Sequence, residues 1–158
     1  DVDISFFMNE TAEKGQIVSV STAGSGAAMD QSLALVSIQG ATGSVIPVGV
    51  LLNDVVDIDL TRQHINWHKD EVQKGGKVAI LKKGYVVTDQ IEGTPTAGAL
   101  AFMDDADTGK FAVAASIDDG EYTAVGRFMS TKDEDGYAKV EVNLPTPIQN
   151  TVAGALLK

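Results

Sequence analysis

Cysteine is absent from the 158-residue chain, so disulfides, thiol nucleophiles and thiolate-bound metals are excluded. Aromatic residues make up only 6% of the chain, and the core must therefore consist of small and β-branched side chains. Such side chains suit pleated, half-buried surfaces. No apolar run approaches the length of a membrane-spanning helix, and we expect no membrane partner.

Basic residues are also scarce. Twelve Lys and Arg stand against 22 Asp and Glu, which gives a net charge of −10. The longest basic run is Lys82-Lys83, so the chain has no basic cluster that would bind phosphate. We therefore expect no nucleic-acid partner.

What the chain does contain is a series of short apolar segments separated by turns rich in Gly and Asp. The 16 glycines and regular spacing predict a mostly β fold, a compact barrel or sandwich over residues 15–144. Residues 78–81 and 85–88 flank Lys82-Lys83-Gly84 and predict a hairpin. Further strands are expected at residues 16–21, 33–38, 45–52, 99–103, 111–116, 122–129 and 138–144.

One motif occurs twice. Val48-Gly49-Val50-Leu51-Leu52 has a near copy in Val125-Gly126-Arg127-Phe128-Met129. The two segments are candidates for paired strands of one barrel, although they are too short to establish an internal duplication.

Three segments fall outside the regular β pattern. Residues 1–14 are expected to form an N-terminal arm, although the alternation of Ile4, Phe6 and Met8 is also compatible with a strand. Residues 55–73 are expected to form an irregular excursion, and residues 145–158 a C-terminal arm beyond the sheet.

No catalytic, cofactor or metal site emerges from the residue patterns. His64 and His68 have zinc-like spacing, but Ile65 stands where a metalloprotease needs Glu, and no third ligand is implied. Asp105, Asp107 and Gly109 partly match a calcium loop whose final Glu is missing.

The acidic segments around Asp105, Asp118 and Asp133 are better explained as turns, in which Asp supports the backbone and Gly takes positive φ. Weak cation binding by their clustered carboxylates stays open. A carboxylate-based hydrolase is a remote alternative.

Four residues are candidates for a partner surface. Phe6 and Phe7 are adjacent aromatics near a terminus, and Trp67 and Arg62 belong to the types enriched among interface anchors. The alternative that Trp67 covers a barrel end and Arg62 is solvated has equal standing.

The order of the strand and turn motifs resembles the decoration, or cement, proteins of tailed-phage capsids. The resemblance covers about two blocks, residues 44–54 and 74–142. The motifs that carry it are Pro47-Val48-Gly49-Val50-Leu51-Leu52-Asn53-Asp54, Glu71-Val72-Gln73-Lys74-Gly75-Gly76-Lys77-Val78 and Ala124-Val125-Gly126-Arg127-Phe128.

This resemblance implies a non-enzymatic, head-stabilising virion protein without cofactors. It would be made in the host cytoplasm and would bind the major capsid protein on the outer capsid surface as a homotrimer. It would bridge capsomers, and its arms would reach neighbouring subunits. We accordingly expect removal of residues 1–14 to weaken capsid binding more than folding. Another virion or surface module, such as a tail-tube, fibre or receptor-binding domain, is the alternative.

Overall fold

The chain is built almost entirely of short β-strands. The computed structural model describes residues 1–8, 10–20, 35–38, 47–57, 71–104, 108–117, 122–144 and 148–150. Within them the only helical element is a single 3-10 turn, Ala114–Ser116, and no helix is long and apolar enough to cross a membrane. The strands are β1 Val2–Met8, β2 Ile17–Val20, β3 Leu35–Ile38, β4 Pro47–Leu51, β5 Asp54–Val56, β6 Glu71–Gln73, β7 Lys77–Leu81, β8 Lys83–Thr88, β9 Ile91–Glu92, β10 Leu100–Met103, β11 Phe111–Ala112, β12 Tyr122–Phe128, β13 Ala138–Asn143 and β14 Ile148–Asn150.

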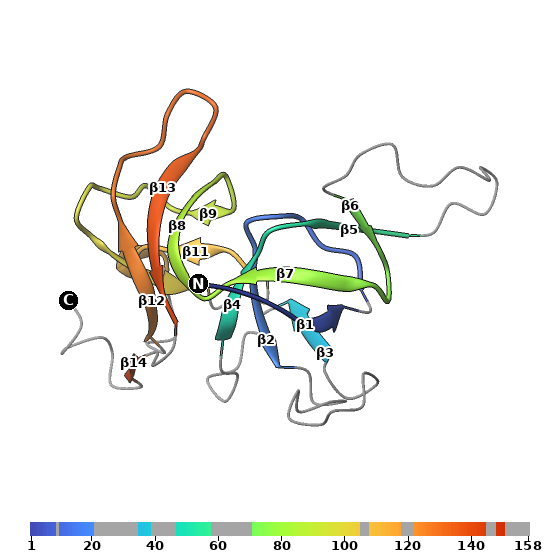
Figure 1. Cartoon of the computed structure of the whole chain (residues 1–158). Coiled ribbons are helices and arrows are strands. Elements are labelled where there is room, and N and C mark those ends of the chain that lie inside the picture. Colours follow the sequence, from blue (N-terminus) through green and yellow to red (C-terminus); the bar gives the residue numbers. More distant parts are fainter. Residues whose placement is uncertain are drawn as a thin grey trace.

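The first half of the chain forms a closed five-stranded barrel in the order β1-β3-β2-β4-β7 (Figure 1). Its interior is filled mostly by aliphatic side chains, and β1 supplies one Phe and one Met to it. A closed barrel leaves no strand edge unpaired, which removes one common route to aggregation. The interior residues are Phe6, Met8, Ala12, Val18, Val36, Leu51, Val55, Val78 and Ile80.

The N-terminal segment belongs to this barrel. Residues 2–8, expected to lie in an arm, form β1, which pairs with β7 antiparallel and with β3 in parallel. The alternation of apolar residues explains the difference, because Phe6 and Met8 point into the barrel and are buried. Without β1 the barrel would be open.

The second half forms a curled sheet in the order β8-β13-β12-β10-β11-β9, with β14 added to one end of β12. The strands predicted on either side of the acidic segments around Asp105 and Asp133 are formed, and they pair antiparallel, β10 with β11 and β12 with β13. In β13 buried and exposed residues alternate strictly, so one face of this strand packs in the core and the other faces solvent.

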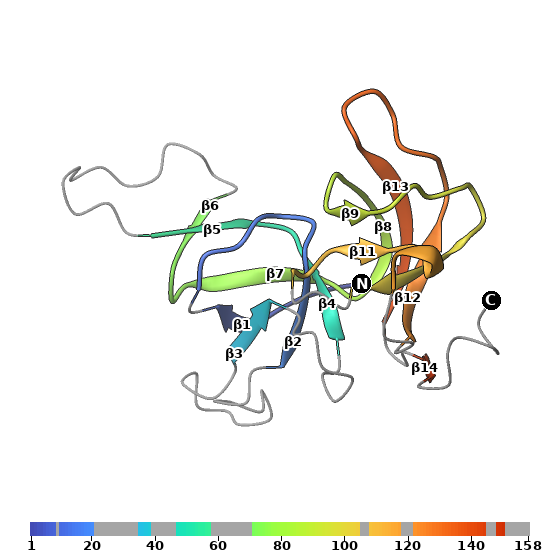
Figure 2. The ribbon, with the colours of Figure 1, turned by 180° about the vertical axis from the view of Figure 1, so that it is seen from behind.

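The predicted hairpin between residues 78–81 and 85–88 is not formed. Instead β7 ends in the barrel, and the next strand, β8, begins the curled sheet after a single linking residue, Lys82 (Figure 1). The direction changes at Gly84, whose φ of 147° lies in a region that other residues rarely adopt. The green strand that bends between the two halves in Figures 1 and 2 is this crossing.

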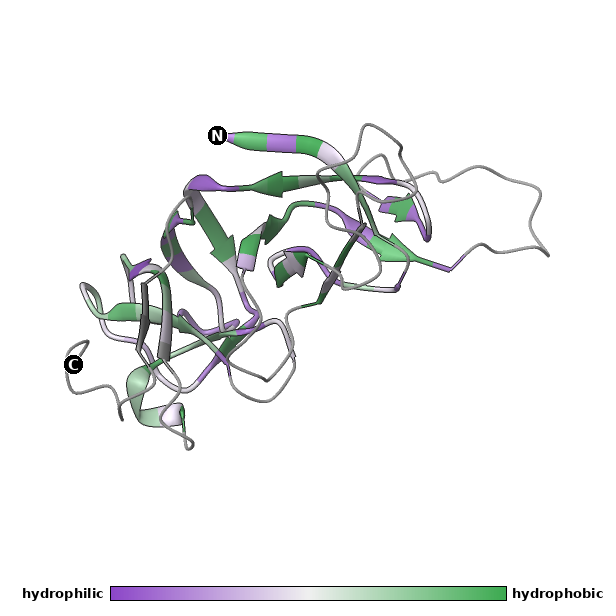
Figure 3. Ribbon diagram, turned by 90° about the horizontal axis from the view of Figure 1, so that it is seen from below, coloured by the Kyte–Doolittle hydropathy of each residue, from purple (hydrophilic) through white to green (hydrophobic). Residues whose placement is uncertain are grey.

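The two sheets share a core. In each of three barrel strands, two adjacent residues face opposite sides. Val18, Leu51 and Ile80 face the barrel interior, and their neighbours Ile17, Val50 and Leu81 face the curled sheet. These three neighbours pack with Phe111, Phe128, Val140 and other buried residues of the curled sheet. Figure 3 shows hydrophobic residues running along the strands of both sheets. Because both faces of these strands are buried at the contact, their sequences are apolar at successive positions there: Ile17-Val18, Val50-Leu51 and Ile80-Leu81.

The repeated motif falls on β4 and β12, which lie in different sheets and do not pair. The glycines nevertheless have the same task, since each allows a neighbouring strand to approach closely. A Cβ on Gly49 would meet Ile80 and the Leu81 carbonyl, and one on Gly126 would meet the Glu141 carbonyl.

The excursion expected at residues 55–73 has an ordered base. Its flanks, β5 and β6, pair in parallel, and Ala12 forms an isolated bridge to Val55. Residues 58–70, with His64, His68, Arg62 and Trp67, lie outside the described residues.

We predict that Gly126→Ala lowers the free energy of unfolding by about 2 kcal/mol or more, because the added methyl would lie within 1.8 Å of the Glu141 carbonyl oxygen and force the backbone apart. Gly136→Asn is a matched control, since nothing lies within 4 Å and Asn tolerates positive φ. Denaturant unfolding of both variants measures the difference. Equal stabilities would contradict the close approach of β12 and β13.

Candidate functional site

The N-terminus is fastened to the crossing between the sheets. The main chain of Lys82 donates a hydrogen bond to the Asp1 carbonyl at 2.9 Å and accepts one from Leu144 at 3.0 Å. The Lys82 ammonium pairs with Asp3 at 2.7 Å and lies 5.7 Å from the centre of the Phe6 ring. Lys82 therefore ties β1, the crossing and the end of β13 together.

The four candidate interface residues do not gather on one surface in the described part of the chain. Phe6 is only 8% exposed and packs in its own barrel, so it offers little area to a partner. Phe7 is half-buried under the Lys77 ammonium at 5.6 Å from the ring centre. Arg62 and Trp67 lie outside the described residues.

Other residues of β1 are exposed instead. The register of β1 against β7 shifts between Asp3 and Phe6. In this irregular stretch Ile4 is 66% exposed, and Val2 beside it is half exposed. We call Val2 and Ile4 the barrel patch. Sequence reasoning missed it because Ile4 follows the same alternation as the buried Phe6 and Met8.

A second apolar surface lies on the outer face of the curled sheet. Tyr85 and Val87 of β8 are 58% and 63% exposed, and Met129 and Tyr137 are also exposed. Met129 lies in the same cross-strand row as Val87, because both flank Lys139. We call Tyr85, Val87, Met129 and Tyr137 the sheet patch. One signal in the sequence could have indicated this patch. In β8 apolar residues occupy successive positions, whereas in the neighbouring strand β13 apolar and polar residues alternate.

Basic side chains and one acidic side chain, Glu141 between Tyr85 and Arg127, border the sheet patch. The Lys139 ammonium lies 4.7 Å from the centre of the Tyr85 ring, a cation–π contact. Arg127 follows in the next row and donates to the Gly98 carbonyl. Lys83 is exposed at the start of β8.

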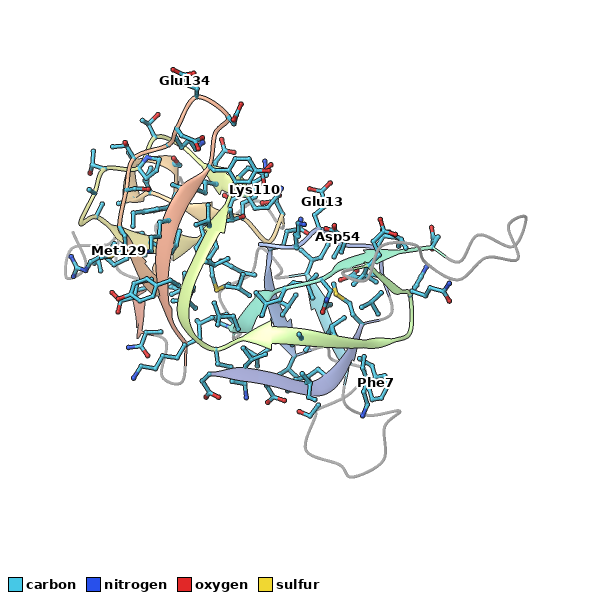
Figure 4. All side chains as sticks on the ribbon, turned by 45° about the horizontal axis from the view of Figure 1, so that its top comes forward. Phe7, Glu13, Asp54, Lys110, Met129 and Glu134 are labelled. Carbon is cyan, nitrogen blue, oxygen red and sulfur yellow. The ribbon has the colours of Figure 1, made fainter. Side chains whose placement is uncertain are left out.

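An open groove of about 940 Å³ lies on the surface between one side of the barrel, with β5 and β6, and the curled sheet. Figure 4 shows Glu13 and Asp54 on its barrel side and Lys110 across from them. Its carboxylates hold loops in place: Glu13 accepts from the Gln90 amide at 3.0 Å, and Asp54 accepts from the Lys14 amide at 2.8 Å. The lining carboxylates are Glu13, Asp54, Asp57, Glu71 and Asp89.

The described residues include no group of three or more metal-ligating side chains placed to hold an ion. The acidic residues at 133–136 form a turn stabilised by hydrogen bonds to the main chain, as expected. Asp133 accepts hydrogen bonds from the main-chain amides of Asp135 and Tyr137, and Gly136 has a φ of 87°. Gly109 likewise has positive φ, whereas Asp105, Asp107 and Asp118 lie outside the described residues.

We predict a stability contribution from Asp3 that disappears in acid. Hydrogen bonds from the side chains of Lys82 and then Ser5 lower the pKa of the Asp3 carboxyl from 3.8 to about 2. A carboxyl with a lowered folded-state pKa stabilises the protein above its unfolded pKa, and this stabilisation is lost as the pH falls from about 4 to about 2.

Asp3→Asn should therefore lower the free energy of unfolding by up to about 1 kcal/mol at pH 7 and by almost nothing at pH 2. Glu134→Gln, at the exposed tip of the β12–β13 loop, is the control and should show little effect at either pH. Denaturant unfolding across the pH range measures both. An Asn penalty that persists unchanged to pH 2 would contradict the Asp3–Lys82 pair.

Comparison with known proteins gives a family. The family model described as XM1 gp53 minor capsid protein matches residues 1–144, from the start of β1 to just past the end of β13. No curated protein matches the chain. The match extends over most of the chain and includes the barrel, the crossing and the sheet patch. The protein therefore belongs to the XM1 gp53 minor capsid protein family, a phage family of capsid-associated virion proteins.

Proposed function

We propose that this protein binds the outer surface of the phage capsid and stabilises the shell by bridging neighbouring capsomers. Its partner is the major capsid protein, and it acts without catalysis or a cofactor. The observation that carries this proposal is a pair of exposed apolar surfaces, the barrel patch and the sheet patch, on two sheets that share one core.

A bridging protein needs at least two contact surfaces and a body that transmits force between them. The barrel and the curled sheet meet through Ile17, Val50 and Leu81, which pack into the core of the second sheet. Close-packed interiors have low compressibility and transmit strain. Pressure from packaged DNA that separates two capsomers would then be resisted through this shared core.

Two linked contacts bind more tightly than either contact alone. Once one patch is bound, the other is held at a high effective concentration near its own partner, so two modest contacts give a large combined affinity. A homotrimer at three-fold positions, as implied by the resemblance to cement proteins, extends this linkage to three copies. The sequence predicted a C-terminal arm at residues 145–158 beyond the sheet, but β14 within it pairs with β12 of the same chain, so only the rest of the arm is proposed to reach a neighbouring subunit.

The role of residues 1–14 changes in the light of the fold. Because β1 closes the barrel, their deletion should unfold the domain as well as abolish binding. Deletion therefore cannot separate binding from folding, and single substitutions at exposed positions are the appropriate test.

The proposal is tested by mixing the purified protein with shells of its own phage that lack it, and measuring co-sedimentation against input concentration. Saturation at a fixed copy number per expanded shell is expected. Absence of binding to expanded shells would overturn the proposal and would favour a role in a tail or fibre.

We predict that Ile4→Lys and Tyr137→Lys each weaken shell binding at least tenfold while leaving the melting temperature nearly unchanged, because both side chains are exposed. Thr96→Lys adds the same charge at an exposed polar position and should bind normally. If either patch variant binds as well as wild type, that patch does not contact the shell.

A further inference from the structure

A single ammonium group lies in the middle of the sheet patch. Lys139 is on β13, an inner strand of the curled sheet, and its side chain is exposed on the outer face. Val87 of β8 stands directly opposite it on one side, and Met129 stands opposite it on the other. Tyr137 comes two residues earlier on the same face, and the centre of the Tyr85 ring lies 4.7 Å from the ammonium. The four residues of the sheet patch therefore surround one positive charge.

This charge has no counter-ion within the described part of the chain. The Lys139 ammonium forms no ion pair with any described residue and instead lies over the Tyr85 ring. Glu141 is the nearest acidic residue along the strand, but it stands directly opposite Arg127 of β12, so those two charges offset each other. Lys139 thus adds an unbalanced positive charge at the centre of the patch, in a chain whose net charge is −10.

A partner that covers the sheet patch must also cover this charge. Each of the four apolar side chains is at least 41% exposed, so their burial is the main gain from docking on this face. The same contact removes water from the Lys139 ammonium. A charge taken out of water without an opposite charge is strongly unfavourable, whereas a carboxylate compensates it through short, charge-assisted hydrogen bonds. The surface therefore selects a partner with an acidic side chain set among apolar residues.

We propose that Lys139 is the anchor of the sheet patch, and that the major capsid protein presents to it the carboxylate of an Asp or Glu flanked by apolar side chains. This inference rests on the capsid-binding role proposed above and names the chemistry of that contact. The Tyr85 ring holds the ammonium before binding, and regular pairing with β13 fixes both flanking strands. The anchor is thus pre-organised, which lowers the cost of ordering it on association.

The site does not depend on what pairs at the edges of the sheet. β13 is flanked by β8 on one side and β12 on the other. A further strand beside β8 would extend the sheet sideways and leave the outer face of β13 open. The contact is therefore made by a sheet face, through side chains, and uses no main-chain group of an edge strand.

The first test compares substitutions at Lys139 by co-sedimentation with expanded shells of the same phage that lack the protein. Lys139→Arg keeps the charge and should bind within about threefold of wild type. Lys139→Met keeps the aliphatic stem but removes the charge, and should bind about tenfold or more weakly, with Lys139→Glu weaker again. Because Lys139 is exposed, the melting temperatures should stay close to that of wild type.

Lys74 provides the matched control. It carries the same charge on the turn between β6 and β7, where its ammonium forms an exposed ion pair with Asp57 at 3.7 Å. Exposed pairs of this kind contribute little to stability. Lys74→Met and Lys74→Glu change the net charge by the same amounts and should bind as wild type does. Equal weakening by substitutions at the two positions would assign the effect to general electrostatic attraction and would overturn the anchor.

The second test identifies the group that Lys139 meets. A carbodiimide joins an amine to a carboxylate in contact with it, forming an amide with loss of water, so the linked residues mark the ion pair. Shells saturated with wild-type protein are treated with the reagent and analysed by peptide mass spectrometry. Lys139 should be linked to an Asp or Glu of the major capsid protein. Lys139→Arg should still bind but lose this link, because a guanidinium does not react.

Full binding by Lys139→Met, or links to the shell only through other lysines, would overturn the anchor and leave the capsid role intact. A link from Lys139 to a second copy of this chain would assign the face to self-association and would also overturn the proposal. Absence of wild-type binding to expanded shells would reject the capsid role itself, and the anchor with it.

Discussion

The single-residue link at Lys82 is the constraint on which the rest of the structure depends. A hairpin there would keep β7 and β8 in one sheet, but Gly84 allows the chain to turn from the barrel into the curled sheet. Lys82 is held by Asp1 and Leu144 through its main chain and by Asp3 through its ammonium. So short a link holds the two sheets against each other, and the strands at the contact must then bury both faces. That requirement explains the adjacent apolar residues Ile17-Val18 in β2, Val50-Leu51 in β4 and Ile80-Leu81 in β7.

This arrangement also determines which surfaces remain for partners. With both faces of the central strands buried, the exposed large apolar side chains of the described residues lie at the start of β1 and on the outer face of the curled sheet. The first gives the barrel patch, with Ile4 at its centre, and the second gives the sheet patch. A body of this kind has its contacts at separate places and a shared core between them. Structural virion proteins that join other subunits require that combination.

Local patterns in the sequence predicted the strands well, but not their partners. Alternation in β13 and the turn chemistry of residues 133–136 are local, and both were predicted correctly. The hairpin at Lys82 was predicted from the same kind of pattern and is absent, because pairing there is decided by Asp1 and Leu144, which are distant in sequence. Phe6 could not be distinguished from Ile4 because the register shift in β1 leaves no local signal. The exposure of Tyr85 and Val87 likewise depends on the place of β8 in the curled sheet, which only the topology reveals. Family resemblance supplied the capsid association, which the residue chemistry alone did not.

A cryo-EM comparison of shells with and without the protein tests the central claim most directly. The account predicts added density on the outer surface, at which each copy contacts at least two capsomers and the barrel and curled sheet fit as one body. Density on the inner surface, or contact with a single capsomer, would contradict a bridging role. Density confined to the tail would place the protein outside the shell altogether.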